Sequence, residues 1–320
     1  MHILLYMNHK ACFLIPIHPP HYKYLSFLTK LNNKHDFSII FVLTYIRDKH
    51  GLINYLSHNI VSTFCNIKYI TLEEDINIAH LISKFDDREC GIINIKKLYG
   101  LNYISQHYDV FDYIGVIDSE IEFIDVDNVY DRFKLICEKK VVIAGNTTIR
   151  NKSLAFLDYI HNASIQYIQI EDRPLVNEMT NNGKYYFWYS DIPVYDRNIL
   201  PSFLTYIGFH NFTNFLKHMC FWSFDYVIYY YYCIAFHNCK VLCMDDYNIK
   251  RHWSLETASY EIYKSVCDHM NYKTSIVIYN TYYKNADLFA KDAHLPIYIY
   301  HLNDGRYNSI YNEIIDYLDN

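Results

Sequence analysis

Short apolar runs alternate with stretches of helical spacing along the first half of the chain. The run Phe37–Leu43 (FSIIFVL) is typical of a strand that is buried on both faces of a sheet. Strands that alternate with helices of ~10–15 residues indicate βαβ units and a mostly parallel sheet. The full pattern predicts strands at 11–17, 37–43, 67–71, 111–117 and 141–144, and helices at 22–31, 52–60, 95–108 and 129–138.

The second half of the chain has a less regular pattern. The segment 224–237 is apolar at nearly every position, so it fits a buried helix or a long strand. No linker rich in Pro, Gly or Ser separates the two halves, and one continuous α/β domain is therefore expected. The remaining signals are strands at 184–189, 240–243, 275–279 and 296–300, and helices from 200, at 255–269 and at 309–318.

The composition is that of an ordinary globular protein. Of 320 residues, 51% are hydrophobic and 20% are charged, and a chain of this length buries a sizeable core. The 8 glycines lie too far apart to form the Gly-rich fingerprints of dinucleotide-binding or P-loop proteins. A net charge of −6 without a basic stripe argues against nucleic acid as a partner.

Cysteine usage and the apolar segments bear on the compartment. The 9 cysteines include no C-x-x-C pair, which disfavours a structural zinc site and favours free thiols in a reducing compartment. The N-terminus carries no secretion signal, and the longest apolar stretch, 226–236, is too short to cross a bilayer. We expect a cytoplasmic protein without a transmembrane segment, with peripheral contact to the inner face of a membrane left open.

The segment with the clearest chemistry is 113–123 (YIGVIDSEIEF), where an apolar strand ends in two carboxylates, Asp118 and Glu120. Ligands bind beyond the carboxyl ends of the strands in open α/β sheets. Two carboxylates at such an end can bind one hard cation, and the cation would then hold a diphosphate. A solvated acidic turn is the plainer interpretation, and the apolar strand in front of the acids favours the site.

Three further segments accompany this motif, at 13–25 (FLIPIHPPHYKYL), 96–104 (KKLYGLNYI) and 251–256 (RHWSLE). Together the four segments resemble the GT-A class of nucleotide-sugar-dependent glycosyltransferases. The D-x-D metal motif of that class would here be Asp-Ser-Glu, with Glu in the last place.

The resemblance implies a GT-A-like, Rossmann-like α/β fold, in which a mostly parallel central sheet is flanked by helices. It further implies a single domain over 1–320. Residues 1–145 would form the half that binds the nucleotide sugar, and the more irregular half, 146–320, would bind the acceptor.

The resemblance also implies roles for individual residues. Mn²⁺ or Mg²⁺ would bridge the two phosphates, held by Asp118, Glu120 and His252. Plainer alternatives are a solvated helix residue for Lys97, a loop residue for His18, and a surface or core histidine for His252. The residues that would contact the nucleotide are Pro16, His18, Tyr22, Lys97, Asp118 and Ser119.

The acceptor side rests on two carboxylates that are candidate catalytic bases. Asp191 follows the aromatic run 187–189, and sugar-binding sites combine aromatic rings, on which sugars stack, with carboxylates, to which they hydrogen-bond. A chain with 18% aromatic residues also forms such clusters by chance. Asp225 lies in an apolar run, and desolvation there would raise its pKa toward the range of a general base. A buried Asp satisfied by hydrogen bonds or by a helix N-terminus is the alternative.

The expected function is metal-dependent transfer of a hexose or pentose from a nucleoside diphosphate sugar to a glycan, glycoconjugate or other hydroxyl acceptor, as in polysaccharide biosynthesis. A UDP-sugar is favoured over a GDP-sugar as the donor. Two alternatives stay open: a nucleotidyl- or phosphoryl-transfer enzyme with a two-carboxylate metal site, and a non-catalytic carbohydrate-binding protein.

Overall fold

The computed structural model describes residues 10–82, 91–119, 128–146, 154–187 and 193–243. The predicted elements at 255–269, 275–279, 296–300 and 309–318 lie outside the described residues. The strands and helices are, in chain order, β1 (Ala11–Pro16), η1 (Pro19–Lys30), β2 (Phe37–Leu43), α1 (Ile46–Asn59), β3 (Ile67–Thr71), η2 (Leu72–Glu74), α2 (Ile76–Ala79), α3 (Ile92–His107), β4 (Tyr113–Val116), α4 (Val129–Lys139), β5 (Val141–Asn146), α5 (Leu154–Ile165), α6 (Arg173–Met179), β6 (Tyr185–Tyr186), β7 (Val194–Asp196), α7 (Leu200–Tyr206), α8 (Phe212–Phe215), α9 (Asp225–His237) and β8 (Lys240–Cys243).

The main sheet has five strands in the order β3-β2-β1-β4-β7. The first four strands of the chain are mutually parallel, and only β7 runs antiparallel, at the edge beside β4. Leu14 of β1 is paired with Ile40 of β2 and with Val116 of β4, so these three strands end at the same edge. The predicted α/β class with a mostly parallel central sheet is confirmed.

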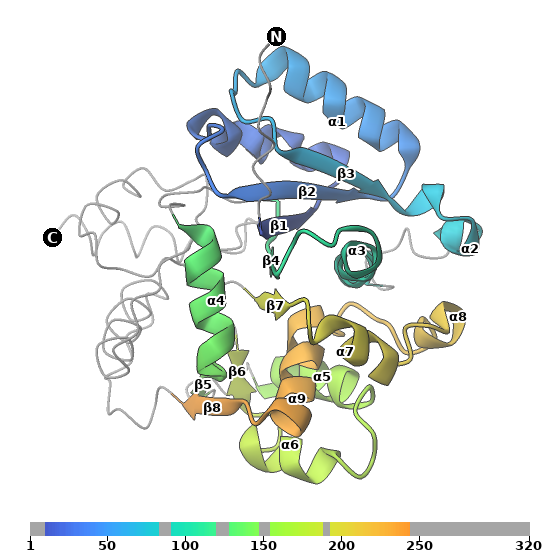
Figure 1. Cartoon of the computed structure of the whole chain (residues 1–320). Coiled ribbons are helices and arrows are strands. Elements are labelled where there is room, and N and C mark those ends of the chain that lie inside the picture. The colour runs from blue at the N-terminus through green and yellow to red at the C-terminus, as the bar shows by residue number, and fades with distance from the viewer. Residues whose placement is uncertain (1–9, 83–90, 120–127, 147–153, 188–192, 244–320) are drawn as a thin grey trace, which may run out of the picture.

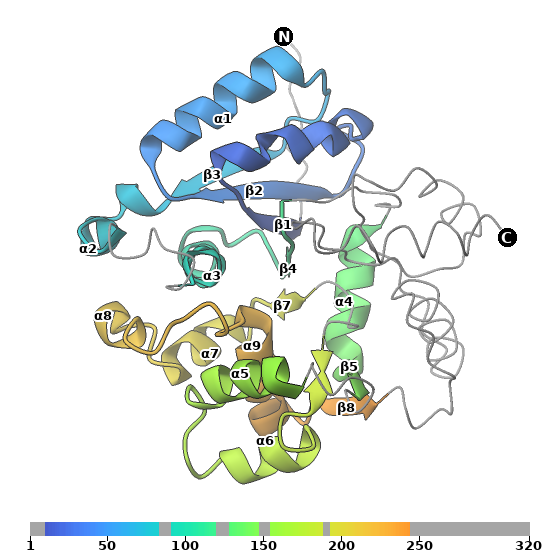
Figure 2. The same ribbon diagram turned by 180° about the vertical axis from the view of Figure 1, so that it is seen from behind.

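Helices cover both faces of this sheet (Figures 1 and 2). On one face, η1, α1 and α4 pack over a core that includes Phe13, Phe41 and Phe133. On the other face, α3 packs over a core that includes Leu14 and Val42 and that continues to α7 and α9. Every residue of β1 and β2 is buried, as expected for central strands that are covered on both sides.

Gly100 leaves room for side chains of the sheet to pack directly on the backbone of helix α3. A Cβ atom on Gly100 would lie 2.7 Å from Cδ1 of Leu14 and 2.8 Å from Cγ2 of Val42. The absence of a side chain therefore lets the helix backbone approach β1 and β2. Lys96 and Lys97 precede this contact by one turn or less and are carried to the carboxyl edge of the strands.

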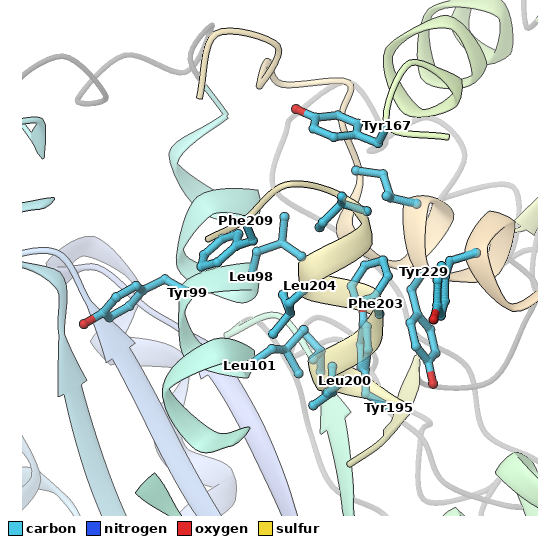
Figure 3. Close-up of a cluster of buried hydrophobic side chains, with 14 of the residues drawn as sticks. Leu98, Tyr99, Leu101, Tyr167, Tyr195, Leu200, Phe203, Leu204, Phe209 and Tyr229 are labelled. Carbon is cyan, nitrogen blue, oxygen red and sulfur yellow. The ribbon is translucent and has the colours of Figure 1, made fainter. Parts of the chain in front are cut away.

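The opposite side of α3 packs against α7, as Figure 3 shows. Leu98 and Leu101 of α3 face Leu200 and Leu204 of α7, and all four side chains are buried. Truncating a buried leucine to alanine costs about 2–5 kcal/mol. The helix that carries the two lysines is therefore fixed from both sides.

The second half of the chain forms a smaller sheet in the order β6-β5-β8. The predicted strand at 141–144 is confirmed as β5, but it pairs with β8 and β6 and does not extend the main sheet. The apolar segment 224–237 is the helix α9, which packs against α5 and α6. None of the helices in the described ranges is long and apolar enough to cross a membrane.

Candidate functional site

Two loops leave the carboxyl edge of the main sheet from the adjacent strands β1 and β4. Backbone pairing continues past the strand ends, since the amide of Ile117 donates to the carbonyl of Leu14 at 3.0 Å. Beyond it, Nδ1 of His21 and Oγ of Ser119 form a buried hydrogen bond of 2.7 Å. His21 of η1, the helix that follows the first strand, therefore lies beside Ser119, while Glu120 lies outside the described residues.

Both lysines of α3 reach this edge. Nζ of Lys96 donates to the carbonyl oxygen of Ile17 at 2.9 Å, and the lysine is only 4% exposed. Nζ of Lys97 lies 2.9 Å from Oδ1 of Asp118, and these two side chains are 12% and 16% exposed. The sequence resemblance implies a role in nucleotide binding for Lys97 but none for Lys96, which is next to it in the same motif. Two ammonium groups and one carboxylate therefore meet at the ends of β1 and β4.

A second carboxylate, that of Asp225, also contacts Lys97. Asp225 is the first residue of α9 and is fully buried. Its Oδ1 atom lies 3.7 Å from Nζ of Lys97, and the hydroxyl of Tyr195 donates to its Oδ2 atom at 2.5 Å. Among the residues that the structure describes, Oδ1 accepts no hydrogen bond.

Burial dominates the electrostatics of Asp225. Desolvation raises the pKa of its carboxyl group, while Lys97 and the Tyr195 hydroxyl oppose that rise and the charge of Asp118 adds to it. A buried charge is costly unless it is paired and hydrogen-bonded, and even a paired one contributes little to stability. Clusters of this kind are candidate functional sites because stability alone does not explain them.

The residues predicted for the nucleotide loop have different surroundings. Pro16 is the last, buried residue of β1. The ring of His18 lies 3.7 Å from that of His21, centroid to centroid, and His21 in turn is hydrogen-bonded to Ser119. The hydroxyl of Tyr22 donates to the carbonyl of Asp48 in α1 at 2.7 Å, and the ring is buried. Tyr22 thus joins η1 to α1 in this arrangement.

The predicted metal set extends beyond the described ranges. Within those ranges, no group of three or more His, Cys, Asp or Glu side chains could hold a metal ion. Asp118 supplies one carboxylate, and Glu120 and His252 lie outside the described residues. Two carboxylates and an imidazole are donors that suit Mn²⁺, and carboxylate oxygens suit Mg²⁺.

The predicted acceptor cluster is only partly described. Asp191 lies outside the described residues. Phe187 is 4% exposed and packs against the rings of Tyr230 and Tyr231. Its aromatic face is therefore part of the core, which is the plainer of the two interpretations of that cluster.

Comparison with known proteins assigns no family. No family model matches the chain, and no curated protein sequence matches it. Among solved structures, the chain is similar to the crystal structure of mouse xyloside xylosyltransferase 1 in its apo form. The TM-score is 0.39 and the identity 9%, over 73% of this chain and 84% of that chain. Similarity this low says nothing about activity, and the function is therefore inferred from the site.

Proposed function

We propose that this chain is a glycosyltransferase that moves a sugar from a nucleoside diphosphate sugar to a hydroxyl acceptor. The observation that carries the proposal is the mostly buried ion pair of Lys97 and Asp118 at the carboxyl ends of β1 and β4. Open α/β sheets bind ligands at this edge, and a fixed cation there suits an anionic diphosphate. The sequence resemblance, which is carried partly by the segments of Lys97 and Asp118 themselves, supports the same conclusion.

The residues at this edge would have two tasks, which are to bind the nucleoside of the donor and to stabilise the diphosphate as it leaves. The ammonium of Lys97 would face the diphosphate and balance the negative charge that grows on it as the bond to the sugar breaks. Pro16 and His18 would border the base and ribose, and the His21 bond would hold the Ser119 hydroxyl in place. Asp118, Glu120 and His252 would hold Mn²⁺ or Mg²⁺, which supplies Lewis-acid neutralisation of the same charge when bound.

The acceptor hydroxyl would form the new bond to the anomeric carbon of the sugar. Its proton would pass to a base on the acceptor side, for which Asp191 remains the candidate. The nucleoside diphosphate would leave with the electrons of the broken bond. A UDP-sugar remains the preferred donor.

The proposal is tested by the product that the full chain releases. The chain would be incubated with UDP-glucose, UDP-galactose, UDP-N-acetylglucosamine and GDP-mannose, each with Mn²⁺ and with EDTA. We expect release of a nucleoside diphosphate, which Asp118→Ala and Glu120→Ala abolish without changing the far-UV circular dichroism. Asp112→Asn is the matched control, because Asp112 pairs with Lys10 at the other edge of the sheet.

Other outcomes would lead to other conclusions. Release of pyrophosphate would indicate nucleotidyl transfer. No turnover, together with no rise in melting temperature on adding UDP and Mn²⁺, would favour a carbohydrate-binding protein. Turnover that survives EDTA would remove the metal from the proposal and leave Lys97 as the cation.

A further inference from the structure

One ammonium group, that of Lys97, is shared by two carboxylates of opposite exposure. Asp118 is partly exposed at the end of β4 and lies 2.9 Å from Nζ. Asp225 is fully buried at the start of α9 and lies 3.7 Å from the same atom. Only the first of these carboxylates stands where a donor would bind.

One carboxylate oxygen of Asp225 is fixed by a hydrogen bond. Tyr195 donates its hydroxyl to Oδ2 of Asp225 and is fully buried on β7. In the sheet, Tyr195 is paired with Ile114 of β4, and its ring lies 4.4 Å from that of Tyr229, centroid to centroid. The position of this hydroxyl is therefore set by the sheet and the core.

We infer that Asp225 and Tyr195 are positioning residues, which fix the ammonium of Lys97 beside Asp118 for the reaction proposed above. The inference rests on that proposed function. A line of contacts runs from Tyr195 through Asp225 and Lys97 to Asp118, and it joins β7, α9, α3 and the end of β4. Without Asp225, the lysine side chain would lose its contact with the start of α9.

The structure disfavours the two other roles of Asp225. A general base must come within hydrogen-bond reach of the acceptor hydroxyl, but Oδ2 of Asp225 is engaged by Tyr195 and its Oδ1 is buried toward Lys97. A purely stabilising role fits poorly too, since replacing a buried ion pair by well-packed neutral groups is often neutral or stabilising. Positioning accounts for both the burial and the contact with Lys97.

The first arm of the test measures donor turnover with the donor panel given above. We expect Asp225→Asn and Tyr195→Phe to lower kcat by about tenfold to a hundredfold, because misplacing a catalytic group by about 1 Å has effects of that size. Asp225→Glu should restore part of the loss if its longer side chain still reaches Lys97. Asp172→Asn is the matched control, since the hydroxyl of Tyr206 donates to Asp172 in the same way, at 2.7 Å, away from Lys97.

A double-mutant cycle separates positioning from a base or a structural role. If Asp225 acts through Lys97, adding Asp225→Asn to Lys97→Met should lower kcat no further than Lys97→Met alone. If Asp225 were a base, the two losses would multiply, and the positioning role would be overturned. Equal kcat for wild type and Asp225→Asn would overturn it as well.

The second arm does not depend on turnover. In urea unfolding, Lys97→Met should destabilise the wild type more than it destabilises Asp225→Asn, because the two side chains are in contact. Additive effects would overturn the anchoring of Lys97 by Asp225. No turnover by the wild type with any donor would overturn the proposed function, while non-additive unfolding would still confirm the anchor.

Discussion

At strands β1 and β4, the two edges of the main sheet differ in how exposed their charged side chains are. At the amino edge of β1 and β4, Lys10 and Asp112 lie 3.6 Å apart with side chains 60% and 40% exposed. Arg197 and Asp109 form a second pair there, and Asp109 is 93% exposed. At the carboxyl edge, Lys96 and Asp225 are buried and Lys97 is nearly so.

This difference in exposure implies a difference in free energy, because a solvated charge costs the fold little and a buried charge must be desolvated. Exposed ion pairs contribute about 0–1 kcal/mol and leave their groups solvated. Taking an ion out of water costs several kcal/mol, which pairing offsets only when the geometry is good. Strands β1 and β4 therefore have exposed charged side chains at their amino ends and buried ones near their carboxyl ends, and the carboxyl edge is where α/β sheets bind ligands.

The largest expected effect comes from Lys97→Met, which removes the cation shared by Asp118 and Asp225. We expect loss of donor turnover by about a hundredfold or more, since such a group acts on the leaving-group charge. We also expect a loss of about 3 kcal/mol in the free energy of unfolding, because Asp225 is left as a buried charge without its cation. Urea unfolding and donor turnover measure the two effects.

The matched change at the other edge is Lys10→Met. The variant loses an exposed ion pair with Asp112 and a cation–π contact with the ring of Tyr130 at 5.7 Å. Because Lys10 is largely exposed, the free energy of unfolding should change by about 1 kcal/mol or less. Similar losses for the two variants would contradict the contrast between the edges.

The main sheet was predictable where its strands carry a long, uninterrupted pattern. The bounds of β2 and β3 agree with the expected 37–43 and 67–71, where β-branched and aromatic residues predominate. The three-residue strand β7 was missed, since it acquires its place only by pairing with β4. The pairing of β5 with β8 could not be foreseen either, because a strand pattern does not name its neighbour.

The site was predictable where position along a strand or helix carried the information. Asp118, Ser119 and Lys97 follow from the end of an apolar strand and from the helix before it. His21 was missed because its partner, Ser119, is 98 residues away. Tyr195 is one of 35 tyrosines, and nothing in the sequence distinguishes the one that contacts Asp225. Long-range contacts of single residues leave no local pattern.

A smaller effect is expected for Ser119→Ala, which removes the buried hydrogen bond to His21. The bond joins η1 to the segment after β4, and losing a buried hydrogen bond costs about 1–3 kcal/mol. Urea unfolding should show a loss in this range, with circular dichroism unchanged. Ser57→Ala is the control, since Ser57 is an exposed residue of α1 whose hydroxyl donates to a helix carbonyl. Equal losses for both serines would show that the bond between Ser119 and His21 stabilises the fold no more than an exposed hydrogen bond does.

The Asp225→Asn variant tests the cost of the buried carboxylate itself. Its pKa in the folded state is raised above the ordinary value of 3.8, so the folded protein binds the proton more tightly than the unfolded chain does. The contribution of this carboxyl group to stability is therefore greatest below pH 3.8 and is lost as the pH rises from there through the raised pKa. The asparagine side chain of the variant is uncharged, so its contribution to stability does not fall in this way as the pH rises.

Relative to the wild type, Asp225→Asn should therefore gain stability with rising pH, by about 1.4 kcal/mol for each unit by which the pKa is raised. Urea unfolding between pH 3 and pH 8 measures the difference. A difference that shrinks with rising pH would mean that Lys97 and Tyr195 more than offset the burial.

The smallest effect is expected at the amino edge, for Asp109→Asn. Its partner Arg197 also donates to the backbone carbonyl of residue 109 at 3.0 Å, and that bond does not depend on the carboxylate. With Asp109 93% exposed, water replaces what the ion pair loses, and the free energy of unfolding should change by less than about 0.5 kcal/mol. What remains should shrink further in 1 M salt, where exposed charges are screened within about 3 Å. A loss of 2 kcal/mol or more would place this exposed pair in the same class as the buried cluster around Lys97, and burial would then no longer explain why the two edges differ.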